Sequence, residues 1–307
     1  IRQILDNDIL PHVGKTPDDR YRKVRFLGHL IRRLLMTYLG LIPSTDRDSY
    51  KNKRINPAGV SYAKIFKTYF NFAIVQQVKR QFRRDFKNTS FSNINLEHSF
   101  THGINSQDFE RSLTQAIITG DKSISIRRKQ ISNNLSSQQL HRKNLINQIS
   151  TLRNINTKNT SSSKQSSRAN EMRRVHSSMI GYVCCVQSAD TGEKVGMQKQ
   201  MAISANICPA GSSELLKDKI LRDSELILLE NIQNKQIYEN KLTKVFVNGD
   251  WLGCCIKPFE FRNKYILMRR KNQIDYLTTI SLEILTNEIY FWIDIGRITR
   301  PLLIVYQ

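Results

Sequence analysis

The chain has 307 residues, 39% of them apolar, and carries 48 lysines and arginines against 26 aspartates and glutamates, a formal net charge of +22. Its length suits two or three domains with real hydrophobic cores, and so large a positive field attracts polyanions. A membrane-spanning protein is excluded, because no apolar run approaches the roughly 20 residues that a span requires.

Two long helices are predicted in the first 90 residues. Residues 19–40 are expected to form the first, ended by Gly40 and Pro43. Its apolar positions recur at helical spacing, opposite a face of arginines and lysines; they are Val24, Leu27, Leu30, Ile31, Leu34 and Leu35. The second helix is predicted over 62–86, and the helix dipole accounts for its basic tail at 79–84.

A polar connection is predicted at 88–108 and a short helix at 109–119. The next stretch, 122–176, holds 12 basic residues and a single acid, Glu171, so that half of the excess charge lies in 55 residues. Ser, Asn, Gln and Thr fill this segment, and 132–172 reads as a loop by composition. A membrane-surface helix would need an apolar face that is missing here, which favours nucleic acid as the partner.

Strands dominate the rest of the chain, which is nearly neutral. A short strand is predicted at 183–186, and 244–253 is predicted to be a hairpin because its central Asn-Gly suits a type I′ turn. A helix follows at 257–271, then a second hairpin at 280–295 and a strand at 302–306. The two tryptophans fall in the hairpin strands and are expected in a core or a partner surface. The predicted fold class is α+β.

Residues for metal or acid–base chemistry are sparse. The five cysteines are odd in number and lack C-x-x-C spacing, which favours free thiols in a reducing compartment over a zinc site. Asp46 and Asp48 could chelate a metal in principle, but the basic residues around them are expected to neutralise both by ion pairing. His176 is expected to be a structural hydrogen-bonding residue. No catalytic residue and no metal ligand are predicted.

The stretch from Asp46 to Gly59 reads DRDSYKNKRINPAG. It resembles the D-R-D-x-x-x-N-K-R-x-x-x-A-G signature of the second-largest subunit of multisubunit DNA-directed RNA polymerases. Further blocks resemble the same subunit in the same order; they lie at 4–14, 142–157, 173–184, 245–253 and 294–302. The resemblance covers essentially the whole chain, and its divergence, with the bias towards Asn, Ile and Lys, suits a large DNA virus or another fast-evolving lineage.

This resemblance implies a multi-module internal fragment. It comprises the C-terminal part of a helical lobe (1–48), a protrusion segment (49–121), a fork domain with a long basic loop (122–205) and a small α+β external domain (206–307). The implied function is DNA-templated RNA synthesis within a multisubunit enzyme. In that family the Mg²⁺ ions belong to the largest subunit, so the fragment itself is expected to bind none and to be inactive alone.

The implied partners are the largest and the smaller polymerase subunits, template DNA and the RNA–DNA hybrid, in the nucleus or in a viral factory or virion. The fork is expected to bind phosphates and to help separate the strands. Phosphate contacts of this kind position nucleic acid without reading its sequence. The candidate residues for this role are Arg127, Arg128, Arg142, Arg153, Lys158, Lys164, Arg168, Arg173, Arg174 and Lys199.

Arg153, Arg173 and Arg174 are the first choices within that set, because they fall inside blocks that match the family. The sequence also departs from the family pattern. Asn154 stands where the family usually has a second arginine, and 158–170 holds serine runs in place of a compact glycine turn. Two alternatives stay open: a free-standing basic nucleic-acid-binding protein without enzymatic activity, and a basic ribosome-associated protein.

Overall fold

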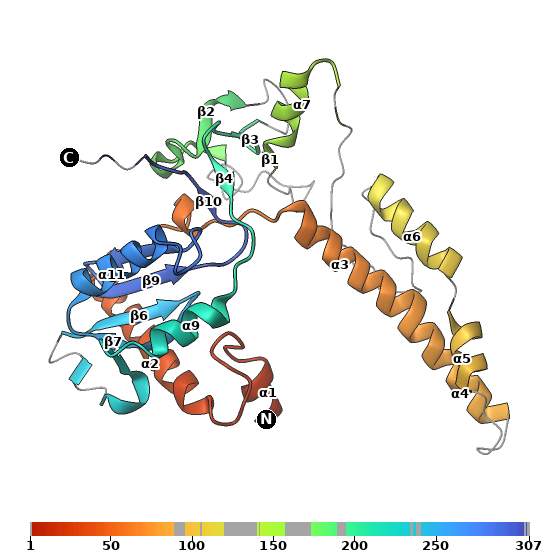
Figure 1. Cartoon of the computed structure of the whole chain (residues 1–307), viewed down its shortest axis with the longest axis horizontal. Coiled ribbons are helices and arrows are strands. Elements are labelled where there is room, and N and C mark those ends of the chain that lie inside the picture. The colour runs from red at the N-terminus through yellow and green to blue at the C-terminus, as the bar shows by residue number, and fades with distance from the viewer. Residues whose placement is uncertain are drawn as a thin grey trace. The chain divides into compact units, whose positions relative to one another are not determined.

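The protein is described by a computed structural model, whose α+β fold confirms the predicted class (Figure 1). The structure describes residues 2–88, 96–104, 106–119, 140, 142–156, 173–188, 195–233, 236–237, 241–303 and 305. Within these residues, no helix has both the length and the apolar character needed to cross a membrane.

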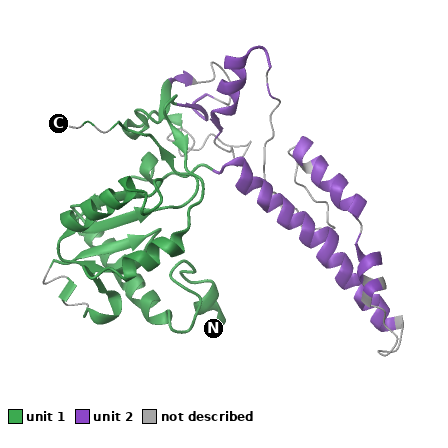
Figure 2. Ribbon diagram, in the orientation of Figure 1, with its two compact units in different colours: residues 1–55, 165–185, 202–307 green, residues 56–164, 186–201 purple. Residues whose placement is uncertain are grey.

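The chain forms two compact units, each assembled from separate stretches of sequence (Figure 2). Unit 1 consists of residues 1–55, 165–185 and 202–307, and unit 2 of residues 56–164 and 186–201. Unit 1 is therefore a discontinuous body, interrupted twice by unit 2.

Unit 1 combines a mixed sheet with helices. Its helices are α1 (Arg2–Asn7), α2 (Arg20–Tyr38), η1 (Tyr50–Asn52), η4 (Ser177–Met179), α9 (Ser213–Leu221), η5 (Leu229–Asn231) and α11 (Pro258–Arg270). Its strands are β4 (Asn206–Ile207), β5 (Leu226–Leu228), β6 (Thr243–Val247), β7 (Asp250–Cys255), β8 (Thr279–Glu283), β9 (Glu288–Trp292) and β10 (Ile298–Thr299). Strand β2 (Val183–Ser188) begins in unit 1 and ends in unit 2.

The main sheet has the strand order β5-β7-β6-β9-β8. β6 and β9 run parallel and the other neighbours antiparallel. Between β6 and β7, Asn248 and Gly249 both have positive φ, 49° and 87°, which confirms the predicted type I′ hairpin. The β8–β9 hairpin is also confirmed, although its second strand ends at Trp292.

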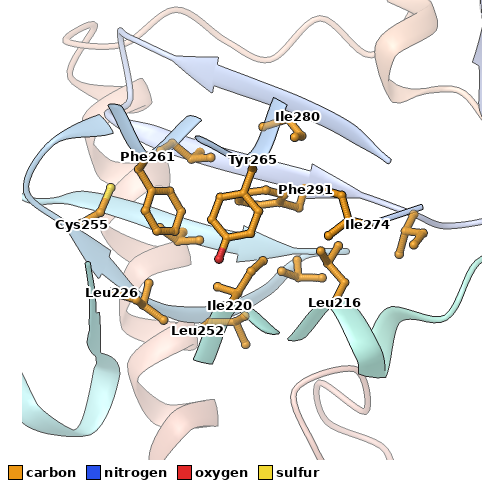
Figure 3. Packing of buried hydrophobic residues seen from close by; sticks show 14 residues of the cluster. Leu216, Ile220, Leu226, Leu252, Cys255, Phe261, Tyr265, Ile274, Ile280 and Phe291 are labelled. Carbon is orange, nitrogen blue, oxygen red and sulfur yellow. The ribbon is translucent and has the colours of Figure 1, made fainter. Parts of the chain in front are cut away.

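Both faces of this sheet are covered, so every residue of β6 and β7 is buried. On one face, Phe261 and Tyr265 of α11 pack on Phe291 of β9 (Figure 3). On the other face, Phe246 and Trp251 pack against α2 and η5. The burial of Trp251 confirms that this tryptophan belongs to a core.

Helix α2 confirms the predicted helix but packs the opposite way from an ordinary amphipathic helix. Its apolar stripe is exposed within the described structure: Leu34 is 69% exposed and Val24 likewise 69%. Its polar face is buried instead: His29 lies against the sheet, and the ammonium of Lys23 donates to the carbonyls of Leu5 and Asp6 in α1. Arg22 contacts Asp250 of β7 at 3.0 Å. Paired charges, with the ring of Phe26 packed on Phe246, therefore hold α2 where a hydrophobic stripe would be expected.

Unit 2 is mainly helical. Its helices are α3 (Ala58–Phe70), the π-helical η2 (Asn71–Val75), α4 (Gln76–Asn88), α5 (Leu96–Gly103), α6 (Ser106–Thr119) and α7 (Leu145–Leu152). Strands β1 (Asn154–Asn156) and β3 (Gln198–Met201) join β2 in a three-stranded sheet of order β1-β3-β2. The predicted second helix is confirmed as the continuous run α3–η2–α4, which starts earlier, directly after Pro57.

Three local predictions were wrong. The segment predicted as a loop at 132–172 contains helix α7 and strand β1, which the Asn144 cap and the pairing of β1 with β3 stabilise. The polar connection predicted at 88–108 contains α5, because tertiary contacts stabilise a helix that its own sequence marks weakly. Gly103 of α5 approaches Val78 of α4 so closely that a Cβ on the glycine would lie 2.9 Å from the Val78 Cα. The strand predicted at 302–306 does not form at the described residues of that range, 302, 303 and 305; the last strand in the described part of the chain is β10, paired with β4.

Candidate nucleic-acid interface

The structure describes five of the ten predicted nucleic-acid-binding residues. The other five lie outside the described residues; they are Arg127, Arg128, Lys158, Lys164 and Arg168. Arg142, Arg153 and Lys199 belong to unit 2, whereas Arg173 and Arg174 belong to unit 1.

Arg153 lies where helix α7 gives way to strand β1. Asn144 caps the helix, its Oδ1 accepting from the Asn147 N–H at 2.7 Å. The helix ends at Leu152 and is capped by Arg153, whose N–H donates back to Ile149 and whose carbonyl accepts from Met201 at 3.1 Å. Hydrogen bonds on both sides thus fix the backbone of this half-buried arginine.

The strand that follows brings Lys199 close to Arg153. β1 pairs antiparallel with β3, with Ile155 directly opposite Lys199 and Asn154 opposite Gln200. Gln200 also donates through Nε2 to the carbonyl of Ser150 in α7, at 3.0 Å. Arg153 and Lys199 therefore belong to one small hydrogen-bonded unit of α7, β1 and β3, called here the β1–β3 platform. Arg142 is exposed, shortly before α7.

Arg173, half-buried, and Arg174, exposed, lead directly into a hydrogen-bonded turn built around His176. The His176 Nδ1 accepts from the Ser178 N–H at 3.1 Å and contacts the Ser178 hydroxyl at 2.7 Å. The Tyr50 N–H donates to that same hydroxyl at 2.9 Å. His176 thus joins the turn to η1, as expected for a structural histidine.

The other ring nitrogen of His176 contacts the first residue of the family signature. Nε2 lies 2.7 Å from Oδ2 of Asp46. Because a backbone N–H can only donate, Nδ1 is the acceptor, so Nε2 carries the proton and donates to Asp46. The hydrogen bond from the Asp48 N–H, and after it the smaller effect of the one from His176, lower the pKa of Asp46 below its ordinary value. Among the described residues, no group of three or more His, Cys, Asp or Glu side chains could hold a metal ion.

The basic residues of the signature pair mostly with more distant carboxylates, which corrects the expectation that they neutralise Asp46 and Asp48. Lys53 does reach Asp48, at 3.5 Å. Lys51, however, pairs with Glu283 of β8. Arg54 reaches Asp294 at 2.5 Å.

The signature is also docked through its backbone. The Ile55 N–H donates to the Gly296 carbonyl at 2.8 Å. Gly296 has φ +85°, and a Cβ there would meet the Ile55 carbonyl oxygen at 2.1 Å. The signature at 46–59, a run of charged residues that looks solvated in the sequence, therefore connects separate parts of unit 1.

Sequence reasoning missed a buried charge cluster in the same unit. Glu288, only 1% exposed, lies 3.4 Å from the ammonium of Lys244 and 3.3 Å from both His29 and Arg33. The Tyr290 hydroxyl donates to it at 2.6 Å. The signal was visible in the sequence, as one charged residue in each of two strongly apolar strands, Thr243–Val247 and Glu288–Trp292.

Comparison with known proteins places the chain among subunits of DNA-directed RNA polymerases. Three family models match successive parts of it: RNA polymerase Rpb2 domain 2 at residues 1–56, domain 3 at 138–207 and domain 4 at 245–306. The chain belongs to the family of second-largest RNA polymerase subunits, as the signature and its neighbouring blocks predicted.

Relatives match along nearly the whole chain. DNA-directed RNA polymerase II subunit RPB2 of Encephalitozoon cuniculi is 29% identical over 304 residues, which are 99% of this chain and 25% of that protein. DNA-directed RNA polymerase subunit 2 of Acanthamoeba polyphaga mimivirus is 26% identical, over 99% of this chain and 25% of that protein. For subunit Rpo2 of Saccharolobus solfataricus the values are 27%, 99% and 26%. The chain thus spans about a quarter of the length of these relatives.

Proposed function

We propose that this chain is the central part of a polymerase subunit that works in DNA-templated RNA synthesis. The observation that carries the proposal is the ordered match of three consecutive Rpb2 domains along one chain. The contact between Asp46 and His176 supports it, because it joins two blocks that sequence comparison singled out independently.

In this proposal the chain divides into the end of a lobe (1–48), a protrusion segment (49–121), a fork (122–205) and an external domain (206–307). Nucleotidyl transfer of this kind uses metal ions held by clustered carboxylates. We propose that the Mg²⁺ ions are held by the largest subunit, as the family resemblance implies. The other polymerase subunits, template DNA and the RNA–DNA hybrid are the proposed partners, in the nucleus or in a viral factory.

The fork would contribute positive side chains rather than chemistry. Arg153 and Lys199 on the β1–β3 platform, and Arg173 and Arg174 beside the His176 turn, are proposed to contact phosphates. The structural support is the fixed backbone at Arg153 and at the turn, since a cation held in place loses less conformational freedom when it binds. Contacts of this kind would hold melted DNA without selecting a sequence.

Alanine substitution of Arg153, Arg173 and Arg174 in the assembled polymerase tests this role. Each lost phosphate contact lowers the slope of log affinity against log salt by about 0.7–0.9, so the slope for promoter-complex stability is expected to fall by about 2. A matched control replaces three exposed cations of unit 1, Arg222, Arg270 and Lys271. The control should keep the parent slope. If the Arg153, Arg173 and Arg174 variant keeps it too, the proposed contacts are wrong.

A free-standing nucleic-acid-binding protein is the second candidate, favoured by the net charge of +22. Purification from the native source separates the two. Co-purification with a larger subunit that carries a metal-binding aspartate cluster supports the polymerase assignment, whereas a chain recovered without one supports the second candidate.

A further inference from the structure

Helix α4 presents a concentrated row of positive charge in unit 2. Five of its side chains are exposed lysines or arginines; they are Lys79, Arg80, Arg83, Arg84 and Lys87. Successive helical residues are about 100° apart, so these five fall within an arc of about 140° centred opposite Val78. They follow one face for about 12 Å along the helix axis.

Packing within unit 2 explains why this face points to solvent. Val78 is 8% exposed and lies against Gly103 of α5. The ring of Phe82 meets that of Phe100 edge-on, with centroids 5.3 Å apart. Because the apolar side of α4 packs against α5, the basic side is the one that no other described residue covers.

The helix dipole does not account for this row, contrary to the sequence interpretation of the basic tail. The favourable effect of a cation is confined to the last turn, and only Lys87 lies there. Nor do ion pairs account for it, since no described carboxylate pairs with any of the five residues. Arg80 contacts an aromatic ring, that of Phe72, at 6.0 Å.

We propose that the basic face of α4 binds the phosphate backbone of a nucleic-acid duplex. A membrane surface fits poorly, because an interfacial helix inserts its apolar face, and that of α4 is occupied. An acidic protein partner fits less well, since the cores of protein interfaces are depleted of lysine and rely on aromatic anchors. A single strand would be bound through stacked aromatic side chains between the cations, whereas the one exposed ring here, Phe86, lies at the edge of the arc.

The site is separate from the one proposed for Arg153 and Arg173, because it uses none of the same residues. Backbone contact alone gives binding that is independent of sequence and strongly dependent on salt. Unit 2 would then contain a site for duplex DNA, in addition to the proposed fork contacts with melted DNA.

The test uses the full-length protein in the complex from which it is purified, with a fluorescein-labelled duplex of random sequence as the probe. The triple variant R80Q/R83Q/R84Q keeps good helix formers but removes three charges. Fluorescence anisotropy between about 50 and 200 mM salt is expected to show a salt slope smaller by about 2–3. The charge-conserving R80K/R83K/R84K variant should retain the parent slope, and the R222Q/R270Q/K271Q control should change it by less than one contact, about 0.9.

An unchanged slope in the triple glutamine variant overturns the proposal, and so does a parent complex that fails to bind the duplex. The same holds if DNA binding is unchanged but a protein subunit dissociates more readily in salt, which would identify an acidic protein as the partner. If the triple variant does not fold, the single variants R80Q, R83Q and R84Q give the answer, each with an expected decrease of about 0.9. The two proposals can fail separately. A smaller salt slope in the α4 variant alone supports only the α4 site, and a smaller slope in the Arg153, Arg173 and Arg174 variant alone supports only the fork contacts.

Discussion

The Glu288→Gln substitution is expected to destabilise unit 1 strongly. The carboxylate is 1% exposed and balances the ammonium of Lys244, itself 7% exposed, and the guanidinium of Arg33. Burial alone would raise the pKa of Glu288, yet the hydroxyl of Tyr290 and the charge of Lys244 together hold it below its ordinary value. The carboxylate is therefore ionised at neutral pH, and glutamine would leave buried positive charge without compensation.

Breaking a buried pair from one side costs about 3–5 kcal/mol. For a unit of this size that corresponds to a melting temperature lower by about 6–20 °C. The chain has two tryptophans, and both Trp251 and Trp292 lie in unit 1. Urea or thermal unfolding followed by tryptophan fluorescence therefore reports on the unit that contains Glu288.

The neighbouring strand supplies the control. Glu283 of β8 is the cross-strand partner of Glu288 and pairs with Lys51 at the surface, its side chain 32% exposed. Glu283→Gln is expected to cost no more than about 1 kcal/mol. The double variant Lys244→Met/Glu288→Leu should recover most of the lost stability, because apolar replacement of a whole buried pair is often neutral. Equal effects of the Glu288 and Glu283 substitutions would refute the reasoning.

Three further outcomes are expected. Burial, with the charge of Lys244, lowers the pKa of His29 to about 4. The lowered pKa contributes about 3 kcal/mol to the unfolding free energy, which is complete above pH 6.5 and is lost as the pH falls towards 4. A His29→Gln variant, followed by urea unfolding at several pH values, should lack this pH dependence. Leu34→Ser should change the unfolding free energy by less than about 0.5 kcal/mol, since Leu34 is 69% exposed; a cost above 2 kcal/mol would contradict the described packing of α2. Gly296→Ala should cost more than about 1 kcal/mol, because φ is +85° and the Cβ would strike the Ile55 carbonyl, and limited proteolysis should then cut faster near Ile55.

Local signals in the sequence were sufficient for several elements. The Asn248-Gly249 pair specified its hairpin because both residues must adopt positive φ. Helical periodicity located α2, although the same periodicity suggested the wrong packing face. The outcome depended on Asp250 and Glu288, which lie more than 200 residues away from their α2 partners and could not be assigned to Arg22 and Arg33 from local pattern.

The candidate site was predictable only in part for a similar reason. The resemblance identified Arg153 and Arg173 as first choices. Strand register, which the residues alone do not specify, placed Lys199 opposite the strand that follows Arg153. The basic face of α4 was overlooked because a dipole explanation was available. Its orientation became clear only with the packing of Gly103 on Val78.

The docking of α2 affects how the protein is made. Arg33 meets Glu288 across 255 residues of sequence, and translation proceeds at about 5–20 residues per second. Newly synthesised α2 therefore waits roughly 13–50 s before β9 leaves the ribosome. During that interval the charged face of the helix lacks its native partner on β9, so α2 is exposed to chaperones and to premature association until that strand arrives.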